Sequence, residues 1–322
     1  MHPLDHQAPA RRFLQLDAPS SPYVVVLPLL LVDIIWCLRG HWTVPTSAML
    51  SALSACLGFL APLTVTRYRR NTGIRTALTS CASFVLFSAT AAVFSYLVVS
   101  TDAPLVDAQL ARLDQWLGFD WPDDFRWLHR YPPLMVMLWL AYGSVILQIG
   151  VVTLYLSFTH RRHRLREFNS VFVISALLCI VISGFIPAAG PFKFYGNLVQ
   201  ADTSMLSHFE FLRDGILRTI DLRTAQGLIS MPSFHMIVAA LNVYSMRGTR
   251  LFPVMLAVNL VVTAATPFCG GHYLVDLIGG VLILAIAIAL HRRVLKSLSA
   301  SLGGHSLNVH QPSGDRSGYA HR

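Results

Sequence analysis

Residues 133–158 read PLMVMLWLAYGSVILQIGVVTLYLSF, an apolar run without a single charged side chain. A hydrocarbon core about 30 Å thick is crossed by roughly 20 such residues in helical form. Backbone amides and carbonyls cannot stay unpaired in lipid, so a run of this length is expected to be a helix. A transmembrane barrel would show alternating apolar and polar residues, and this run does not alternate. The stretch therefore predicts a membrane-spanning helix.

Seven further apolar stretches lie on either side of this run. They cover about 22–38, 45–66, 76–100, 169–188, 231–246, 252–268 and 272–290. Of the 322 residues 54% are hydrophobic and 13% charged, and the mean hydropathy is +0.55, which excludes an ordinary soluble domain. We predict an all-α, polytopic membrane bundle of about eight transmembrane helices.

The expected domain organisation is simple. A single transmembrane domain is predicted over residues 22–296. The polar segments 1–21 and 297–322, which show little apolar periodicity, are predicted to be disordered tails.

The basic residues indicate an orientation. Eight spans place both termini on one side, and 17 of the 25 Lys and Arg residues fall on that side, against eight on the other. Lys and Arg accumulate on the cytoplasmic side of membrane proteins. Both termini are therefore predicted to be cytoplasmic, in what would be the inner membrane of a bacterium. The net charge of +9 is explained by the basic residues that set the membrane topology. A nucleic-acid partner is not expected, because the Lys and Arg residues lie in short loops between helices.

The cysteines and the first apolar run carry simpler predictions. The five cysteines lie in or beside apolar spans without paired spacing, which favours packing roles over disulfides or a zinc site. The first run contains Asp33 and is not followed by a small-residue cleavage site, so no cleavable signal peptide is expected. Asp33 itself is expected to pair with a neighbouring helix.

Two long loops fall on the side opposite the termini. The loop at about 101–132 contains DAPLVDAQLARLDQWLGFDWPDDFRW, whose leucines fall near helical spacing, and predicts a short amphipathic helix in the membrane interface. The loop at about 189–230 carries four basic residues on the side that topology leaves poor in positive charge. These candidates for binding an anionic substrate are Lys193, Arg213, Arg218 and Arg223. The alternative is that they contact lipid headgroups.

Two segments place polar groups where apolar spans begin. They are GLISMPSFHMIVAAL at 227–241 and TPFCGGHYLVDLIGG at 266–280. Both enter their helices from the side opposite the termini. His235, His272 and Asp276 are therefore expected to meet at one membrane face, although some forty residues separate the two segments.

The spacing within the second segment is informative. His272 and Asp276 are four residues apart, which places them on one face of a helix. A carboxylate that accepts a hydrogen bond from one ring nitrogen leaves the other free to act as nucleophile or base. Gly270 and Gly271 leave room for close approach of a bulky group, so Gly271 is a candidate for substrate contact. The alternative is a histidine–aspartate pair that only connects helices.

The first segment resembles a helix start that can bind an anion. Ser230 can cap the helix and Pro232 suits its first turn, so the amides around Ser233 and Phe234 are expected to bind phosphate oxygens. His235 follows closely enough to give a proton to a departing alkoxide. The alternative is a capped helix with a buried histidine.

The sequence PSFH followed by GGHYLVD resembles the second and third signature motifs of the type 2 phosphatidic acid phosphatase superfamily, over about residues 184–290. The resemblance implies that His272 attacks phosphorus to give a phosphohistidine, that His235 protonates the leaving group, and that Asp276 orients His272. It also implies that neither a metal nor another cofactor is needed. The six-helix core of the family would occupy about 76–290, with two helices added in front.

Three positions depart from the family pattern. Lys193 is not followed by the usual Arg-Pro pair, Thr266 replaces an arginine, and Phe234 stands where glycine is commonest. The arginines of the 189–230 loop would have to supply the missing charge. With its His-Tyr-x-x-Asp third motif, the pattern is most similar to the inositolphosphotransferase branch, which includes inositol-phosphorylceramide synthases.

Three functions are compatible with these residues. The first two differ in what attacks the phosphohistidine, and the third involves no catalysis. Water would make the protein a phosphatase acting on a lipid phosphate or an isoprenoid diphosphate. An alcohol on a lipid, inositol or sugar would make it a headgroup phosphotransferase. A non-catalytic transporter or scaffold, whose polar residues line a path or groove among membrane lipids, is the third.

Overall fold

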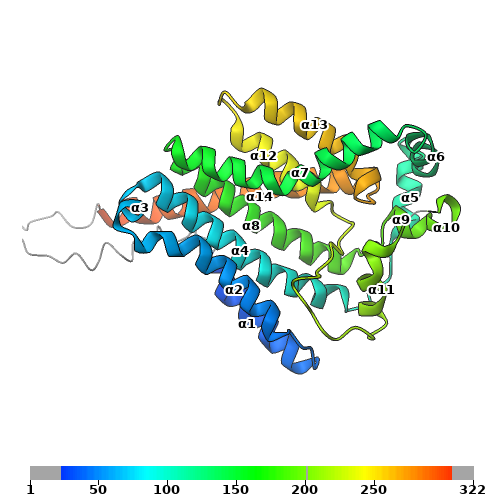
Figure 1. Ribbon diagram of the computed structural model, residues 1–322, viewed down its shortest axis with the longest axis horizontal. Helices are drawn as coiled ribbons and strands as arrows, with labels where there is room; N and C mark the ends of the chain where they lie inside the picture. The colour runs from blue at the N-terminus through cyan, green and yellow to red at the C-terminus, as the bar shows by residue number, and fades with distance from the viewer. Residues whose placement is uncertain (1–22, 201, 307–322) are drawn as a thin grey trace, which may run out of the picture.

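The computed structural model describes residues 23–200 and 202–306, and the described chain is helical without a β-strand (Figure 1). The long helices lie side by side as one bundle. They are α1 (Tyr23–Arg39), α2 (Thr46–Leu60), α4 (Thr72–Val99), α7 (Pro132–Phe158), α8 (Arg162–Phe185), α12 (Phe234–Met246), α13 (Phe252–Cys269) and α14 (Leu274–Ser306). The all-α prediction is confirmed.

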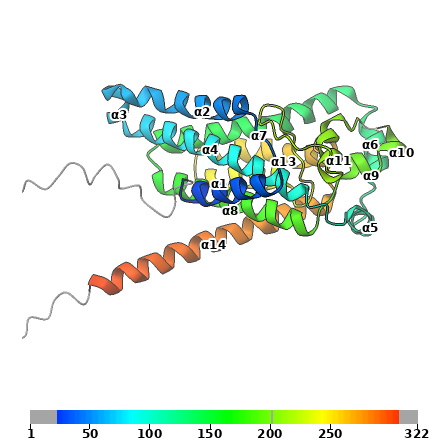
Figure 2. The ribbon, with the colours of Figure 1, turned by 90° about the horizontal axis from the view of Figure 1, so that it is seen from below.

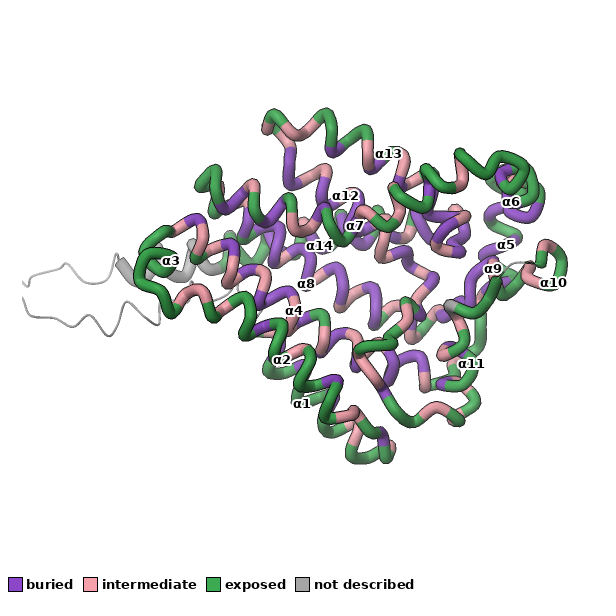
Figure 3. The backbone as a smooth tube through the Cα atoms, in the orientation of Figure 1, coloured by how far each residue is buried: buried purple, intermediate pink, exposed green. Residues whose placement is uncertain are grey.

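Helices α4 and α8 form the centre of the bundle. Helix α4 packs against α1, α2, α7 and α8, and α8 also packs against α12 and α14. Edge-to-face aromatic pairs join the two central helices, with ring centroids 5.0 Å apart for Phe84 and Phe172 and 5.7 Å apart for Phe84 and Phe168. The peripheral helices α1 and α2 are mostly exposed (Figure 3), as lipid-facing helices are.

The short helices gather at one end of the bundle, on the right of Figure 1. They are α5 (Asp107–Trp116), α6 (Trp121–Leu128), α9 (Pro191–Phe194), α10 (Gly196–Val199), the 3-10 helix η3 (Ser204–Leu206) and α11 (Ser207–Arg213). Helices α12 and α14 begin at this end, which we call the histidine end. The opposite end carries the 3-10 helix η2 (Ala61–Thr64) and α3 (Thr66–Arg70).

Within residues 23–200 and 202–306, six helical segments are long and apolar enough to cross a membrane. They are Thr46–Thr64, Thr72–Val99, Pro132–Phe158, Arg162–Phe185, Phe252–Cys269 and Leu274–Leu295. They correspond to six of the eight predicted spans. Of the other two, α1 has 17 residues, which is the predicted length, and α12 has 13 residues and is shorter than the predicted span 231–246. Helix α12 is shortened because the chain before Phe234 bends into the site described below instead of continuing the helix.

Two sequence predictions differ from the structure. Helix α14 continues to Ser306, past the predicted start of the C-terminal tail, and leaves the bundle as it does so (Figure 2). Asp33 is 3% exposed, yet neither of its carboxylate oxygens has a hydrogen-bond partner. The expected pairing with a neighbouring helix is therefore wrong, because α1 packs on an apolar stretch of α4. The N-terminal tail and residues 307–322 lie outside the described residues.

Candidate active site

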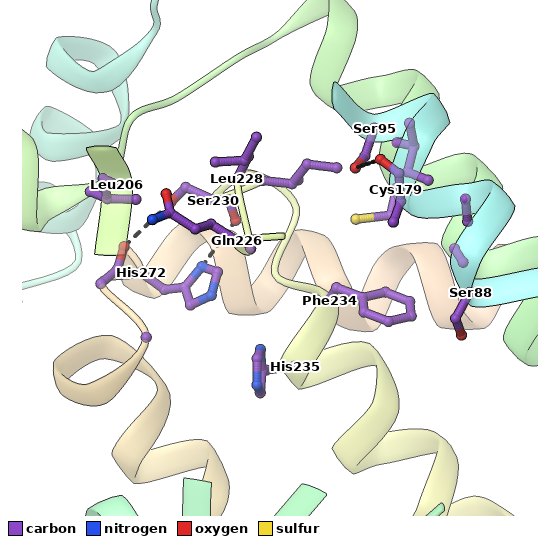
Figure 4. A pocket seen from close by; sticks show the side chains of 18 of the residues that line it. Ser88, Ser95, Cys179, Leu206, Gln226, Leu228, Ser230, Phe234, His235 and His272 are labelled. Carbon is purple, nitrogen blue, oxygen red and sulfur yellow. Dashed lines mark hydrogen bonds between the residues drawn. The ribbon is translucent and has the colours of Figure 1, made fainter. Parts of the chain in front are cut away.

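A cavity of about 280 Å³ opens at the histidine end. Its walls come from α4, α8, the start of α12, the segment before it and the turn between α13 and α14. Both His235 and His272 line it, one from α12 and one from that turn (Figure 4). The structure thus brings the two predicted histidines to one space.

His272 is held by two oxygen atoms. Its Nδ1 lies 3.0 Å from the carbonyl oxygen of Ser230 and 3.4 Å from Oδ2 of Asp276. A carbonyl oxygen only accepts hydrogen bonds, so Nδ1 carries the proton and donates. The other ring nitrogen, Nε2, is therefore unprotonated in the neutral ring and available for attack on an electrophile. The contact between Asp276 and His272 was predicted from the sequence, whereas the contact with the backbone carbonyl of Ser230, which is nearer, was not.

Asp276 is completely buried and joins three parts of the site. Its Oδ2 accepts hydrogen bonds from the hydroxyl of Ser230 at 2.8 Å and the amide of Tyr273 at 2.9 Å, in addition to facing His272. Its Oδ1 has no hydrogen-bond partner. A buried carboxylate with spare acceptor capacity stabilises a positive charge on the adjacent imidazole.

His235 is positioned by Tyr142 of α7. The two rings are stacked, with centroids 4.1 Å apart and planes inclined by 15°, and the tyrosine hydroxyl lies 3.1 Å from His235 Nδ1. The second ring nitrogen of His235, Nε2, is not used in this contact and is available to a molecule in the cavity. Tyr142 was not anticipated from the sequence, because nothing in an apolar span marks which tyrosine meets a histidine from another helix.

The start of α12 differs in detail from the prediction. Ser233, not Ser230, is the cap, and its hydroxyl accepts from the amide of Met236 at 3.4 Å. Its own amide donates to the carbonyl oxygen of Asp276 at 3.0 Å, so Ser233 ties α12 to α14 and is fully buried. Phe234 lines the cavity and packs edge-on against Phe172.

Gly271 lines the cavity in a left-handed conformation, with φ of +64°. A Cβ atom there would lie 2.3 Å from the ring of Phe192. The close approach that the sequence predicted at this glycine is therefore made by a side chain of the protein itself. Any larger residue would push Phe192 or the turn out of place.

The far wall of the cavity is apolar and lies deep in the bundle. Phe87, Ala91, Phe172, Ala176 and Ile180 line it from the two central helices. Phe87 lies twelve residues before the end of α4 at Val99, which is about 18 Å along the helix axis. The cavity therefore combines two imidazoles with a hydrocarbon-like wall.

The four predicted basic ligands do not line this cavity. Lys193 pairs with Glu210. Arg213 lies 2.7 Å from a carboxylate oxygen of Asp102, and it also donates to a backbone carbonyl at 2.9 Å.

The other two arginines are partnered as well. The guanidinium of Arg218 lies 4.8 Å from the ring centroid of Trp42, and Arg223 pairs with Asp221 at 2.6 Å. Hydrogen bonds from Arg223 lower the pKa of Asp221 to about 2. Among the described residues, the cavity wall contains no lysine or arginine.

Thr266, which stands where the family pattern has an arginine, is fully buried in α13. Its hydroxyl donates to the carbonyl oxygen of Val262 at 2.7 Å. The side chain therefore serves its own helix and supplies nothing to the cavity.

The 101–132 loop contains residues that sequence reasoning missed. The expected amphipathic helix exists as α5, and Leu113 and Trp116 are exposed on it. Its opposite face, however, buries Asp107 and Asp114 against the site. Burial raises the pKa of Asp114 to about 6 and also raises that of Asp107. An aspartate repeated after seven residues was the available signal, because that spacing places both on one helix face.

In the part of the chain that the structure describes, no three His, Cys, Asp or Glu side chains come together in a group that could hold a metal ion.

Comparison with known proteins identifies the family. Residues 108–290, more than half of the 322-residue chain, match the PAP2 superfamily. The chain therefore belongs to the PAP2 superfamily, and this membership supports phosphatase or phosphotransferase chemistry on lipid phosphates in the membrane. No curated protein and no solved structure matches the chain.

Proposed function

We propose that the protein is a membrane-embedded lipid phosphate or diphosphate phosphatase that works through a phosphohistidine on His272. The observation that carries the proposal is the pair of imidazoles on one cavity, with the Nδ1 proton of His272 held by Ser230 and Asp276. This arrangement leaves an oriented, unprotonated nitrogen beside a second histidine, as nucleophilic catalysis requires.

The reaction divides between the two histidines. Nε2 of His272 attacks phosphorus, the bond from phosphorus to the lipid oxygen breaks, and protonated His235 gives its proton to that oxygen. Water, deprotonated by His235, then attacks the phosphohistidine, and inorganic phosphate leaves with His272 restored. Asp276 stabilises the positive charge that develops on the His272 ring.

The apolar interior of the cavity supports a lipid as the substrate. Hydrocarbon in contact with Phe87, Ala91 and Phe172 is removed from water, at about 25 cal/mol per Å². A phosphate attached to such a chain would be brought to the two histidines that line the same cavity. Soluble phosphate esters lack this contact and should be poorer substrates.

A second candidate is headgroup transfer from a phosphodiester lipid. The cavity wall of the described chain holds no lysine or arginine, so the two histidines are its only titratable cations. One imidazolium balances the single negative charge of a phosphodiester better than the double charge of a phosphomonoester. This charge balance favours a diester donor, and an alcohol would then replace water as acceptor.

The basic residues support an orientation for the site. The majority of Lys and Arg lies on the side of both termini, which we propose to be cytoplasmic. The histidine end would then face the extracytoplasmic side. Accessibility of single cysteines introduced at Asp123 and Arg69 to a membrane-impermeant reagent tests this, since only the first should react in intact cells.

The function is tested with purified protein and three donors of different charge: a lipid phosphomonoester, an isoprenyl diphosphate and a diacyl phosphodiester. Free phosphate is scored against new phospholipid in the presence of an added alcohol. Phosphate from the first two supports the phosphatase, and new phospholipid from the third supports the transferase. Absence of turnover with all three donors rejects both.

Metal independence is tested in the same assay. We expect turnover to persist in EDTA, because two histidines and one carboxylate carry the proposed reaction without a Lewis acid. Loss of turnover in the chelator, with recovery on adding a divalent cation, would contradict the phosphohistidine scheme as written.

A further inference from the structure

Two buried carboxylates of α5 lie beside the active site without lining its cavity. Asp107 and Asp114 are 5% and 2% exposed, and their spacing of seven residues puts both on the helix face that also buries Leu110 and Ala111. A buried carboxylate is costly unless several donors surround it. The hydrogen-bond donors around these two carboxylates show which chain segments α5 contacts.

Asp107 joins two chain segments at the site. Its Oδ1 accepts from the amide of Gly190 at 2.8 Å and from the hydroxyl of Tyr273 at 3.0 Å. Its Oδ2 accepts from the amide of Ala189 at 3.0 Å. One side chain thus connects the turn before α9 to the residue that follows His272.

Asp114 acts on the start of α14. Its two oxygens accept from the amides of Leu274 at 2.8 Å and Val275 at 3.0 Å. The first amides of a helix have no acceptor within the helix, and a negative charge is favourable at that terminus. Asp114 therefore caps α14 from a different helix, two residues beyond His272.

Packing connects the turn held by Asp107 to the other side of His272. A Cβ atom on Gly190 would lie 2.5 Å from the carbonyl oxygen of Gly271, which shows how closely the two backbones approach. The ring of Phe192, just after this turn, covers Gly271 equally closely. The backbone on both sides of His272 is therefore fixed by contacts that lead back to α5.

We propose that Asp107 and Asp114 are positioning residues that hold the backbone of residues 271–275, so that Nε2 of His272 faces the cavity. The proposal rests on the proposed role of His272 as nucleophile. It assigns a function to the buried face of α5. Since small displacements of a nucleophile slow the chemical step, the effect is expected in kcat.

The first test separates positioning from folding. Asp114→Asn replaces one acceptor with a donor that faces a backbone amide, and we expect kcat to fall at least about tenfold while KM stays within about twofold. The matched control is Glu167→Gln, which alters a carboxylate that is 6% exposed and also has two donors, but lies at the opposite end. Glu167→Gln should keep wild-type kcat even if it loses as much thermal stability as Asp114→Asn does.

A milder pair of variants keeps the test valid if Asp114→Asn fails to fold. Tyr273→Phe removes only the hydroxyl that Asp107 accepts, and a fall in kcat of about threefold is expected. Because both changes act on one contact, Asp107→Asn combined with Tyr273→Phe should cost less than the product of the single effects. The proposal is overturned if kcat is unchanged in all of these variants. It is also overturned if Glu167→Gln loses as much kcat as Asp114→Asn at the same loss of thermal stability.

A second readout does not depend on activity. Amide hydrogen exchange in purified Asp114→Asn should become faster in the peptide covering residues 271–277 and stay unchanged in the peptide covering 244–250. Unchanged exchange at 271–277 would overturn the proposal. If the wild-type protein turns over none of the three lipid donors, the proposed function fails, and hydrogen exchange still decides whether α5 fixes this backbone.

Discussion

The two ends of the bundle each contain a buried carboxylate network, and the network at the histidine end borders the cavity lined by His235 and His272. At the histidine end, Asp276 of α14 faces His272 and keeps one oxygen without a hydrogen-bond partner. At the opposite end, Glu167 of α8 accepts from the hydroxyl of Tyr244 at 2.6 Å and pairs with Arg247 at 2.7 Å.

The difference is the reason why we propose a catalytic role for one network and a structural role for the other. Glu167 has a partner for each oxygen, one of them a cation, so its charge is already balanced within the protein. Asp276 has neutral donors and one histidine, and that histidine presents a free nitrogen to an open space. Burial alone does not distinguish Asp276 from Glu167, because both carboxylates are buried. They differ in that Asp276 lies next to a cavity-lining histidine and has an oxygen without a hydrogen-bond partner.

The largest effect is expected at the nucleophile. His272→Ala removes the attacking nitrogen and should lower kcat by at least about 10³-fold in the donor assay. His163→Ala, at an exposed histidine of the opposite end, is the matched control and should keep wild-type activity. Retained turnover in folded His272→Ala would remove the basis for assigning function to this end.

A smaller loss is expected at the proposed proton donor. His235→Ala should lower kcat by about 10²-fold with a lipid alkoxide as leaving group. With 4-nitrophenyl phosphate, whose leaving group needs no protonation, the phosphorylation step should be far less impaired. An equal loss in the rate of the phosphorylation step with both substrates would mean that His235 positions the phosphate and does not transfer the proton.

The network at the opposite end should affect stability and not turnover. Glu167→Gln weakens the contact with Arg247, whose side chain is 37% exposed, and should lower the free energy of unfolding by about 1–3 kcal/mol. Thermal unfolding in detergent measures this loss, and kcat should remain within about twofold. A large loss of kcat at unchanged stability would show that the two ends are coupled.

The smallest effect is expected at an arginine that the sequence put forward as a phosphate ligand. Arg223 pairs with Asp221 two residues away and does not line the cavity. Arg223→Gln should therefore change kcat/KM by less than about twofold, as expected for an exposed ion pair. A tenfold rise in KM for a phosphomonoester would mean that this loop closes over bound substrate.

The sequence by itself determined the fold class and singled out the candidate site residues. Apolar runs of about twenty residues must become helices in lipid, because no other structure of that length satisfies its own backbone. His235, His272 and Asp276 stood out because ionisable groups are costly at the start of an apolar span. PAP2 superfamily membership agrees with that reading of the motifs.

Only the tertiary structure decided the partners of these residues. The carbonyl of Ser230 at His272, Tyr142 at His235 and Asp114 at the start of α14 are contacts between distant segments, and no periodicity or spacing encodes them. The same limit explains the four basic residues of the 189–230 loop. Their charge and side were visible in the sequence, but whether a cation meets substrate or a neighbouring carboxylate depends on how the loop folds back on itself.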